Sequence, residues 1–218
     1  MLTFSEENYL KAIFHLEQKF DNGANTNSLA KKMETKPSSV TDMVKKLADK
    51  KLVNYKKYQG AKLSQSGKET AIKVIRKHRL WEVFLVEKLE FSWDEVHEIA
   101  EQLEHIKSEK LTRQLDKFLG YPKRDPHGDP IPNEKGNFTV YDNRLLSELE
   151  IGKSGICMGV KDSSPTFLRY LDKINIALGE EISVVEKESF DQSIKIKTNN
   201  EFHTISNLTA NNLYIKTL

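Results

Sequence analysis

The chain has 218 residues, of which 38% are hydrophobic and 30% charged, and its formal net charge is +2. This composition indicates a globular protein with room for two or three small domains, and no apolar run reaches the roughly 20 residues of a membrane span. The start MLTFSEENYL lacks the pattern of a secretion signal. Because Cys157 is the only cysteine, internal disulfides are excluded and we expect a cytoplasmic protein.

Charge is unevenly distributed along the chain. Residues 1–77 carry 16 Lys and Arg against 8 Asp and Glu, whereas residues 78–120 carry 6 against 10 and residues 121–218 carry 12 against 14. A basic first segment followed by an acidic one predicts a module that binds polyanions, joined to a part that attracts cations.

The first 64 residues have the pattern of a helix, a short helix, a third helix and a hairpin. Ser5 is the expected N-cap of the first helix, Pro37 stands in the first turn of the third, and alternation around Gly60 predicts the hairpin. This order predicts a winged helix-turn-helix that binds DNA, and the alternative is a small helical domain with solvated lysines. The residues expected to face DNA are Pro37, Ser38, Ser39, Thr41, Lys45, Lys56, Lys57 and Lys62.

Three further helices are expected between residues 65 and 120. The first starts after Ser64, and the others are capped by Ser92 and Ser108. They are too apolar to be solitary and could form the dimer interface that a palindromic DNA site requires. The segment YPKRDPHGDPIPNEKGN predicts a loop. From residue 138, short alternating strands and one helix at Ser164 predict a small β-barrel.

The segment VHEIAEQLEH concentrates metal-binding residue types on one side of a predicted helix that extends to Ile106. Its members span about 100° of arc. They are His97, Glu101, Glu104 and His105. His78 and Glu82 lie one turn apart on the preceding helix, so packing of the two helices would bring these donors together. Imidazole and carboxylate without thiolate favour Mn²⁺ or Fe²⁺, with Zn²⁺ as an in vitro alternative, and an ordinary solvated acidic face is the simpler explanation.

An enzyme is not expected. HEIAE is similar to the metalloprotease motif H-E-x-x-H, but Glu101 stands where that motif has its second histidine. The sequence also lacks a phosphate-binding Gly-rich loop and a nucleophile constellation. A metallohydrolase is therefore the least favoured alternative.

Several segments together resemble the diphtheria toxin repressor family of metal-dependent regulators, in its manganese-responsive three-domain branch. They are SEENYLKAIFHLE, KPSSVTDMVKKLADKKLVNYKKYQGAKLSQSGK, RKHRLWEVFL, VHEIAEQLEHIKSE and DPHGDPIP. The resemblance implies a multidomain α+β chain. Its parts are a winged helix-turn-helix at 1–64, a helical dimerisation and metal-binding domain with a Pro-rich connector at 65–137, and an SH3-like barrel at 138–218.

The same resemblance implies a homodimeric, metal-dependent repressor of metal-uptake genes that binds a palindromic operator. Metal is expected to neutralise repelling carboxylates and to draw the first helix against the ligand helices. The alternative within this class is a regulator with a structural metal site and constitutive DNA binding.

The resemblance also implies two sets of metal ligands. Glu101, Glu104 and His105 match one set, and a glutamate at 101, where iron-responsive members usually carry cysteine, points to manganese. His78, Glu82 and His97 match further ligand positions. Asp125 and His127 match an ancillary site that Asp162 of the barrel is expected to reach.

Two residues of the first helix depart from the family pattern. Asn8 stands where the family places Asp or Met, and we keep it as a ligand through its amide oxygen. Lys11 stands where two-domain manganese regulators place an acidic ligand, so the sequence predicts a site with fewer carboxylates.

Overall fold

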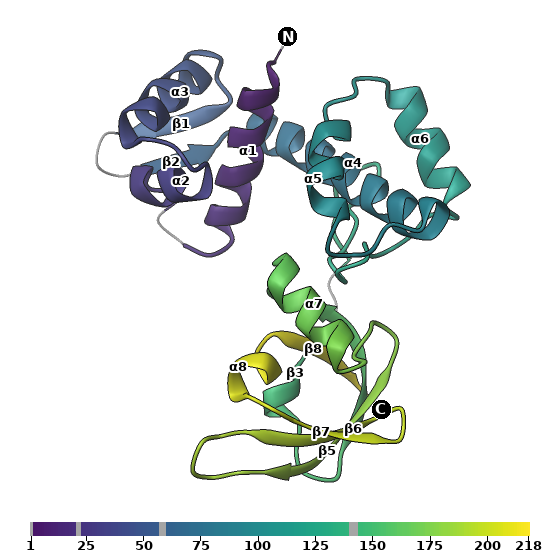
Figure 1. Ribbon diagram of the computed structural model, residues 1–218. Coiled ribbons are helices and arrows are strands. Elements are labelled where there is room, and N and C mark those ends of the chain that lie inside the picture. The colour runs from purple at the N-terminus through teal and green to yellow at the C-terminus, as the bar shows by residue number, and fades with distance from the viewer. Residues whose placement is uncertain (1, 21–22, 57–59, 140–143) are drawn as a thin grey trace. The chain divides into compact units, whose positions relative to one another are not determined.

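The computed structural model describes residues 2–20, 23–56, 60–139 and 144–218 (Figure 1). Two compact units are assembled from segments that alternate along the chain. The first unit comprises Met1–His78, Gln102–Ser108 and Pro132–Asn137. The second comprises Arg79–Glu101, Glu109–Ile131 and Phe138–Leu218. Each unit therefore includes part of the helical middle of the chain.

The first unit begins with helix α1 (Phe4–Glu17). Thr3 is its N-cap: the Thr3 side chain accepts a hydrogen bond from the backbone N–H of Glu6, and the Glu6 carboxylate accepts one from the backbone N–H of Thr3. This reciprocal capping box starts the helix before Ser5, so the prediction of Ser5 as the cap was wrong. The expected apolar stripe is buried and consists of Tyr9, Leu10, Ile13, Phe14 and Leu16.

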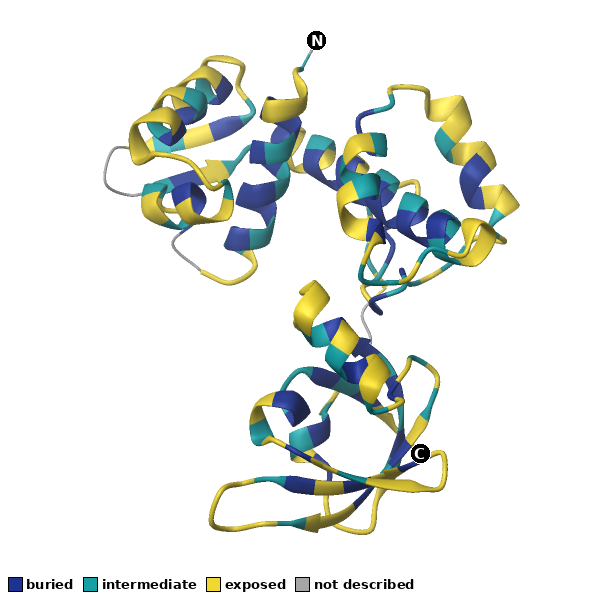
Figure 2. Ribbon diagram, in the orientation of Figure 1, coloured by how far each residue is buried: buried dark blue, intermediate teal, exposed yellow. Residues whose placement is uncertain are grey.

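The winged helix-turn-helix predicted for the first unit is confirmed. Helices α2 (Thr26–Lys32) and α3 (Pro37–Asp49) are followed by the antiparallel strands β1 (Val53–Lys56) and β2 (Gly60–Leu63). Pro37 stands in the first turn of α3, where its missing N–H leaves no helical hydrogen bond unmade. Buried residues from the three helices share one core, which includes Leu10, Ile13, Leu29, Val40 and Leu47 (Figure 2).

Helix α4 (Gln65–Leu89) runs through both units, and α5 (Val96–Leu103) and α6 (Glu109–Phe118) follow it. The hydroxyl of Ser64 accepts from the backbone N–H of Gly67, as expected for a cap. The prediction that α5 continues to Ile106 was wrong. Glu104 and His105 instead form a turn in which both are buried, because the turn brings them to hydrogen-bond partners in the first unit.

The C-terminal domain is built on an antiparallel sheet with the strand order β3-β8-β4-β5-β6-β7. Its elements are β3 (Arg144–Leu145), η1 (Leu146–Glu148), β4 (Ser154–Val160), α7 (Pro165–Lys173), β5 (Glu181–Lys187), β6 (Ile194–Thr198), β7 (Glu201–Ile205), α8 (Asn207–Ala210) and β8 (Leu213–Thr217). The predicted strands at β5 to β8 are confirmed, as is the helix that starts at Ser164 and Pro165. Strand β4 was not predicted, because Gly155 and Gly159 interrupt its apolar pattern.

The barrel core is made of aliphatic side chains from the sheet and from α7, including Leu168, Leu171, Ile182, Ile196 and Ile215. Trp93, just before α5, packs against this core, and its indole N–H donates to the Asp172 carboxylate at 3.0 Å. The barrel is therefore attached to the helical part of its own unit. In the described part of the chain, no helix is both long enough and apolar enough to cross a membrane.

Candidate metal centre and nucleic-acid interface

Titratable side chains gather in two places. The first group, in the second unit, is called here the loop cluster and consists of Glu82, Asp125 and His127. The second group, in the first unit, is called the first-helix cluster. It consists of Glu7, Lys11, His78, Glu104 and His105.

The loop cluster has the donor set of a cation site. Glu82 comes from α4, while Asp125 and His127 come from the Pro- and Gly-rich loop after α6. All three side chains are buried, and one donor atom from each lies within 4.8 Å of the other two. Two carboxylates and one imidazole suit a divalent ion such as Mn²⁺ or Fe²⁺. Because carboxylates buried together repel each other, these residues fit a divalent cation well.

Hydrogen bonding fixes the orientation of the His127 ring. Its Nε2 lies 2.7 Å from the carbonyl oxygen of Trp93, which can only accept, so Nε2 carries the proton. The other ring nitrogen, Nδ1, lies 3.7 Å from Glu82 Oε1. Imidazoles that bind metals are commonly held in this way by a backbone carbonyl. Burial alone would lower the pKa of His127, but the hydrogen bond and negative charge of Glu82 raise it to about 9.

The surroundings of Asp125 favour the protonated form of its carboxyl group. Burial, together with the negative charges of Glu82 and Asp129, raises the pKa of Asp125 to about 7, although Arg79 acts in the opposite direction. Asp125 Oδ1 accepts from the backbone N–H groups of His127 at 2.9 Å and Asp129 at 3.0 Å. Arg79 Nε lies 3.4 Å from the other oxygen. The loop is therefore preformed around a carboxyl group whose pKa is raised by burial and by neighbouring negative charge.

Gly128 allows this loop to approach the barrel closely. Its φ is +90°, and a Cβ built there would lie 2.2 Å from both Gly159 Cα and the Met158 carbonyl oxygen. The backbone N–H of Val160 on β4 donates to the carbonyl oxygen of His127 at 2.9 Å. Only glycine fits both the conformation and the space, so β4 anchors the loop that carries Asp125 and His127.

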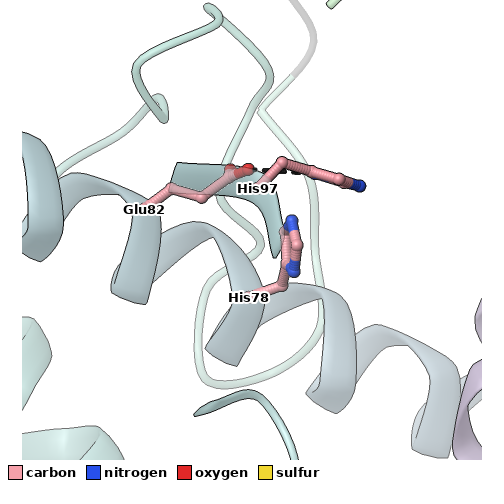
Figure 3. A group of neighbouring side chains, drawn as sticks. All are labelled: His78, Glu82 and His97. Carbon is pink, nitrogen blue, oxygen red and sulfur yellow. Dashed lines mark hydrogen bonds and ion pairs between the residues drawn. The ribbon is translucent and has the colours of Figure 1, made fainter. Parts of the chain in front are cut away.

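A second grouping shares Glu82. One donor atom from each of His78, Glu82 and His97 lies within 4.8 Å of the other two (Figure 3). His97 Nδ1 is 3.4 Å from Glu82 Oε1, but 56% of the His97 side chain is exposed. His78 Nδ1 is hydrogen-bonded to the Glu104 carboxylate, so only its other ring nitrogen is left for this grouping. The loop cluster, whose members are all buried, is therefore the stronger cation site.

The first-helix cluster is centred on Glu104, which is fully buried. Lys11 Nζ lies 2.7 Å and 2.8 Å from its two carboxylate oxygens, and His78 Nδ1 lies 2.6 Å from one of them. Burial alone would raise the pKa of Glu104, but the hydrogen bond from His78 and the charge of Lys11 outweigh burial and lower it. Glu104 is therefore an ionised carboxylate that is already neutralised by neighbouring side chains.

His105 completes the contact between its turn and α1. Its Nδ1 lies 2.6 Å from Glu7 Oε2, and its ring stacks on Phe4 with 4.5 Å between centroids. The sequence had not indicated Glu7, because an acidic residue in the first turn of a helix is usually solvated. Its partner His105 is 98 residues away, so the sequence contains no local signal of this contact.

The remaining expected ligands are not gathered around one position. The buried amide oxygen of Asn8 has no hydrogen-bond partner in the described chain. Glu101 is partly exposed and lies 3.8 Å from His97 Nε2. Asp162 is exposed, and its carboxylate accepts from the backbone N–H of Ser164. Among the described residues, the groups close enough to hold an ion do not include Glu101, Glu104, His105 or Asp162.

The expected DNA surface is largely exposed. On α3, Pro37, Ser38, Ser39 and Lys45 are exposed. Thr41 is half-buried, and its hydroxyl donates to the carbonyl oxygen of Pro37 at 3.0 Å, so it offers less to a base edge than expected. On the hairpin, Lys56 and Lys62 are exposed, while Lys57 lies outside the described residues.

Two lysines at the C-terminal end of α3, Lys46 and its C-cap Lys50, bind a buried carboxylate of the first helix. Lys46 and Lys50 lie 3.0 Å and 2.7 Å from the buried carboxylate of Glu6. Burial alone would raise the pKa of Glu6, but hydrogen bonds from Lys50, the Thr3 backbone and Lys46 lower it to about 2. The recognition helix is therefore fastened to the start of α1.

Comparisons with known families cover most of the chain. Residues 1–61 match the family described as "Iron dependent repressor, N-terminal DNA binding domain". Residues 64–133 match "Iron dependent repressor, metal binding and dimerisation domain". Residues 144–217 match the FeoA domain, in agreement with the expected SH3-like barrel.

Individual relatives agree with these matches. The "Iron-dependent repressor IdeR" of Mycobacterium leprae is 34% identical over 131 residues, which is 60% of this chain and 56% of the relative, so the chain spans little more than half of its length. The "Diphtheria toxin repressor" of Corynebacterium diphtheriae is 28% identical over 194 residues, covering 88% of this chain and 79% of the relative. A solved structure described as "Manganese-dependent transcriptional repressor complex with manganese" is 32% identical with a TM-score of 0.85, covering 98% of this chain and 100% of that one.

Proposed function

Because the chain belongs to the diphtheria toxin repressor family of metal-dependent transcriptional regulators, we propose that it represses metal-uptake genes when Mn²⁺ binds at the loop cluster. The family consists of DNA-binding repressors and not of enzymes, so the metallohydrolase alternative is dropped. The observation that carries the proposal is the buried group of Glu82, Asp125 and His127 on a chain whose first domain has a basic winged helix.

The choice of Mn²⁺ rests on the chemistry of the donors. The loop cluster offers two carboxylates and one imidazole and no thiolate. Such a set favours a hard or borderline ion, so Mn²⁺ and Fe²⁺ are preferred to ions that seek sulfur, and Zn²⁺ is expected to bind in vitro. The manganese-bound repressor of similar structure adds weight to Mn²⁺.

The connectivity of the chain supports a coupling between this site and DNA binding. A bound divalent ion would supply the positive charge that offsets the repulsion between Glu82 and Asp125. Glu82 lies on α4, which begins at Gln65. Ser64, which caps α4, directly follows the wing strand β2. Asp125 and His127 lie on the loop that β4 anchors. Joining Glu82 to this loop therefore restrains the helix that continues from the winged domain.

We further propose that the active form is a homodimer on a palindromic operator. Two copies of α3 would then enter successive major grooves, with Ser38, Ser39 and Lys45 toward the DNA and the hairpin lysines at phosphates. The helical part of the chain has exposed apolar side chains suited to a subunit interface. They are Leu89, Leu111, Phe118 and Tyr121.

A DNA mobility shift with metal-free and Mn²⁺-loaded protein tests the proposal. We expect wild type to bind operator DNA only when Mn²⁺ is present. Glu82→Gln should lose this response, because it removes a charged donor from the loop cluster. Glu87→Gln is the matched control on the same helix, since the Glu87 side chain is 52% exposed. Equal shifts with and without Mn²⁺ in wild type would contradict metal activation.

A further inference from the structure

The first-helix cluster contains a positive charge at the carboxylate where the family resemblance places a metal ion. Lys11 Nζ contacts both oxygens of Glu104, at 2.7 Å and 2.8 Å, and the two side chains are only 12% and 0% exposed. His78 Nδ1 occupies a further lone pair of the same carboxylate at 2.6 Å. Each oxygen of Glu104 therefore already has a strong donor.

The other expected donors do not offset this positive charge. His105 Nδ1 is hydrogen-bonded to Glu7 at 2.6 Å, so only its neutral Nε2, which lies 3.8 Å from Glu104 Oε1, could face an ion. Asn8 offers only a neutral amide oxygen, which is a poorer partner for a hard dication than a carboxylate. An ammonium group this close would also repel a divalent ion, most strongly in a buried setting. The residues of the first-helix cluster therefore do not fit a divalent cation.

We propose that the ammonium group of Lys11 takes the place of a metal ion in the first-helix cluster and holds α1 against residues Gln102–Ser108 without any metal. The metal response then depends on the loop cluster alone, with one ion per chain. This second statement rests on the proposed function, whereas the role of Lys11 does not.

The contacts are suited to a permanent attachment. Lys11 and Glu104 are 93 residues apart in sequence, and the Glu7–His105 pair spans 98 residues. Lys107 Nζ adds a hydrogen bond to the carbonyl oxygen of Leu2 at 3.2 Å. Removing one partner of a buried ion pair leaves an uncompensated charge, which is strongly destabilising. Lys11 should therefore stabilise the protein when no metal is bound. A site built for a metal ion would instead stabilise the protein only when the ion is present.

Metal counting after equilibrium dialysis against Mn²⁺, by elemental analysis of the full chain, tests the assignment. We expect one ion per chain in wild type, one in Glu104→Gln and none in Glu82→Gln. Two ions in wild type, with one lost in Glu104→Gln, would overturn the role of Lys11 and leave the loop cluster in place. One ion retained in both Glu82→Gln and Glu104→Gln would instead contradict the proposed site and leave the role of Lys11 in place. One ion retained in Glu82→Gln but lost in Glu104→Gln would overturn both.

Thermal unfolding of the chelated protein gives an independent readout. Lys11→Met should lower the melting temperature well below that of Lys19→Met, a matched control at an exposed position. Adding Glu104→Gln to Lys11→Met should recover part of the loss, because the buried carboxylate is no longer left charged. Equal melting temperatures for Lys11→Met and Lys19→Met would overturn the proposal.

Discussion

At the scale of single residues, Asp125 and His127 hold protons that a divalent ion must displace. Their pKa values are raised to about 7 and about 9, so both groups are more protonated at lower pH. Since a metal binds the ionised carboxylate and the neutral imidazole, Mn²⁺ affinity should fall as pH drops from about 8 to about 6. Calorimetric titrations in buffers of different ionisation enthalpy would show protons released on binding.

Asp125→Asn should weaken Mn²⁺ binding and flatten this pH dependence. Asp162→Asn is the matched control, because Asp162 is exposed and bonded to its own turn. An affinity for Mn²⁺ that does not change with pH in wild type would contradict the assignment of the loop cluster. Equal weakening by both substitutions would show that the barrel supplies a ligand.

The sequence indicated which residues belong to the candidate metal centre more readily than which side chains contact each other. The types and spacing of Glu82, Asp125 and His127 singled them out in the sequence, with family resemblance needed for the last two. That Lys11 would lie near Glu104 was indicated only by the family resemblance, which places position 11 at the metal site, because the 93 residues between them give no local signal of contact. Long-range pairing depends on how α1 packs against the turn after α5, which is a property of the folded chain.

At the scale of elements, the loop after α6 depends on one glycine. Gly128→Ala should lower stability by roughly 1–3 kcal/mol and weaken Mn²⁺ binding, because the new methyl group must displace β4 or the loop. Gly152→Ala separates backbone strain from steric overlap. The φ of Gly152, +82°, is similar to that of Gly128, but nothing lies within 4 Å of a Cβ added at Gly152. Urea unfolding with Mn²⁺ titration measures both effects. Equal behaviour of the two variants would mean that close approach to β4 is unimportant.

The recognition helix and the wing should contribute to DNA binding in different ways. Lys56→Ala should weaken binding to all sequences alike and lower the salt slope by about one, because a phosphate contact releases roughly one counterion. Ser39→Ala should change the preference among operators instead. Fluorescence anisotropy at several salt concentrations distinguishes the two. Identical effects on specific and random DNA for both variants would argue against α3 as the recognition helix.

The ends of helices could be predicted from the sequence only where a residue at the end itself marks the boundary. Ser64 and Pro37 mark helix starts through their own side chains, and both were predicted correctly. The end of α5 at Leu103 was missed, because the helical pattern continues through Ile106. Hydrogen bonds to α1 and α4, invisible in a local window, decide that the chain turns there.

At the scale of the whole molecule, the three-domain division at 64/65 and 137/138 stays a prediction, since the compact units are assembled from segments on both sides of these boundaries. Homodimerisation also stays a prediction. Phe118 on α6 is 64% exposed beside an apolar cluster that includes Phe84 and Leu115. Phe118→Glu should therefore shift the protein toward monomer, which light scattering after gel filtration measures.

A matched substitution controls for surface charge. Phe190→Glu alters a side chain that is 94% exposed on the barrel, so it should leave the oligomeric state unchanged. A dimer in both variants would place the subunit interface elsewhere, and a monomeric wild type would contradict the homodimer itself.

Coupling between Mn²⁺ binding and DNA binding can be measured directly. Operator fragments are selected from random DNA with the Mn²⁺-loaded full chain, and their dissociation constant is measured with and without Mn²⁺. We expect DNA binding to be tighter by roughly 5–150-fold with Mn²⁺, and Mn²⁺ affinity to rise by the same factor when DNA is present. Glu82→Gln should abolish both gains. The same dissociation constant with and without Mn²⁺ in wild type would contradict metal activation and favour constitutive DNA binding.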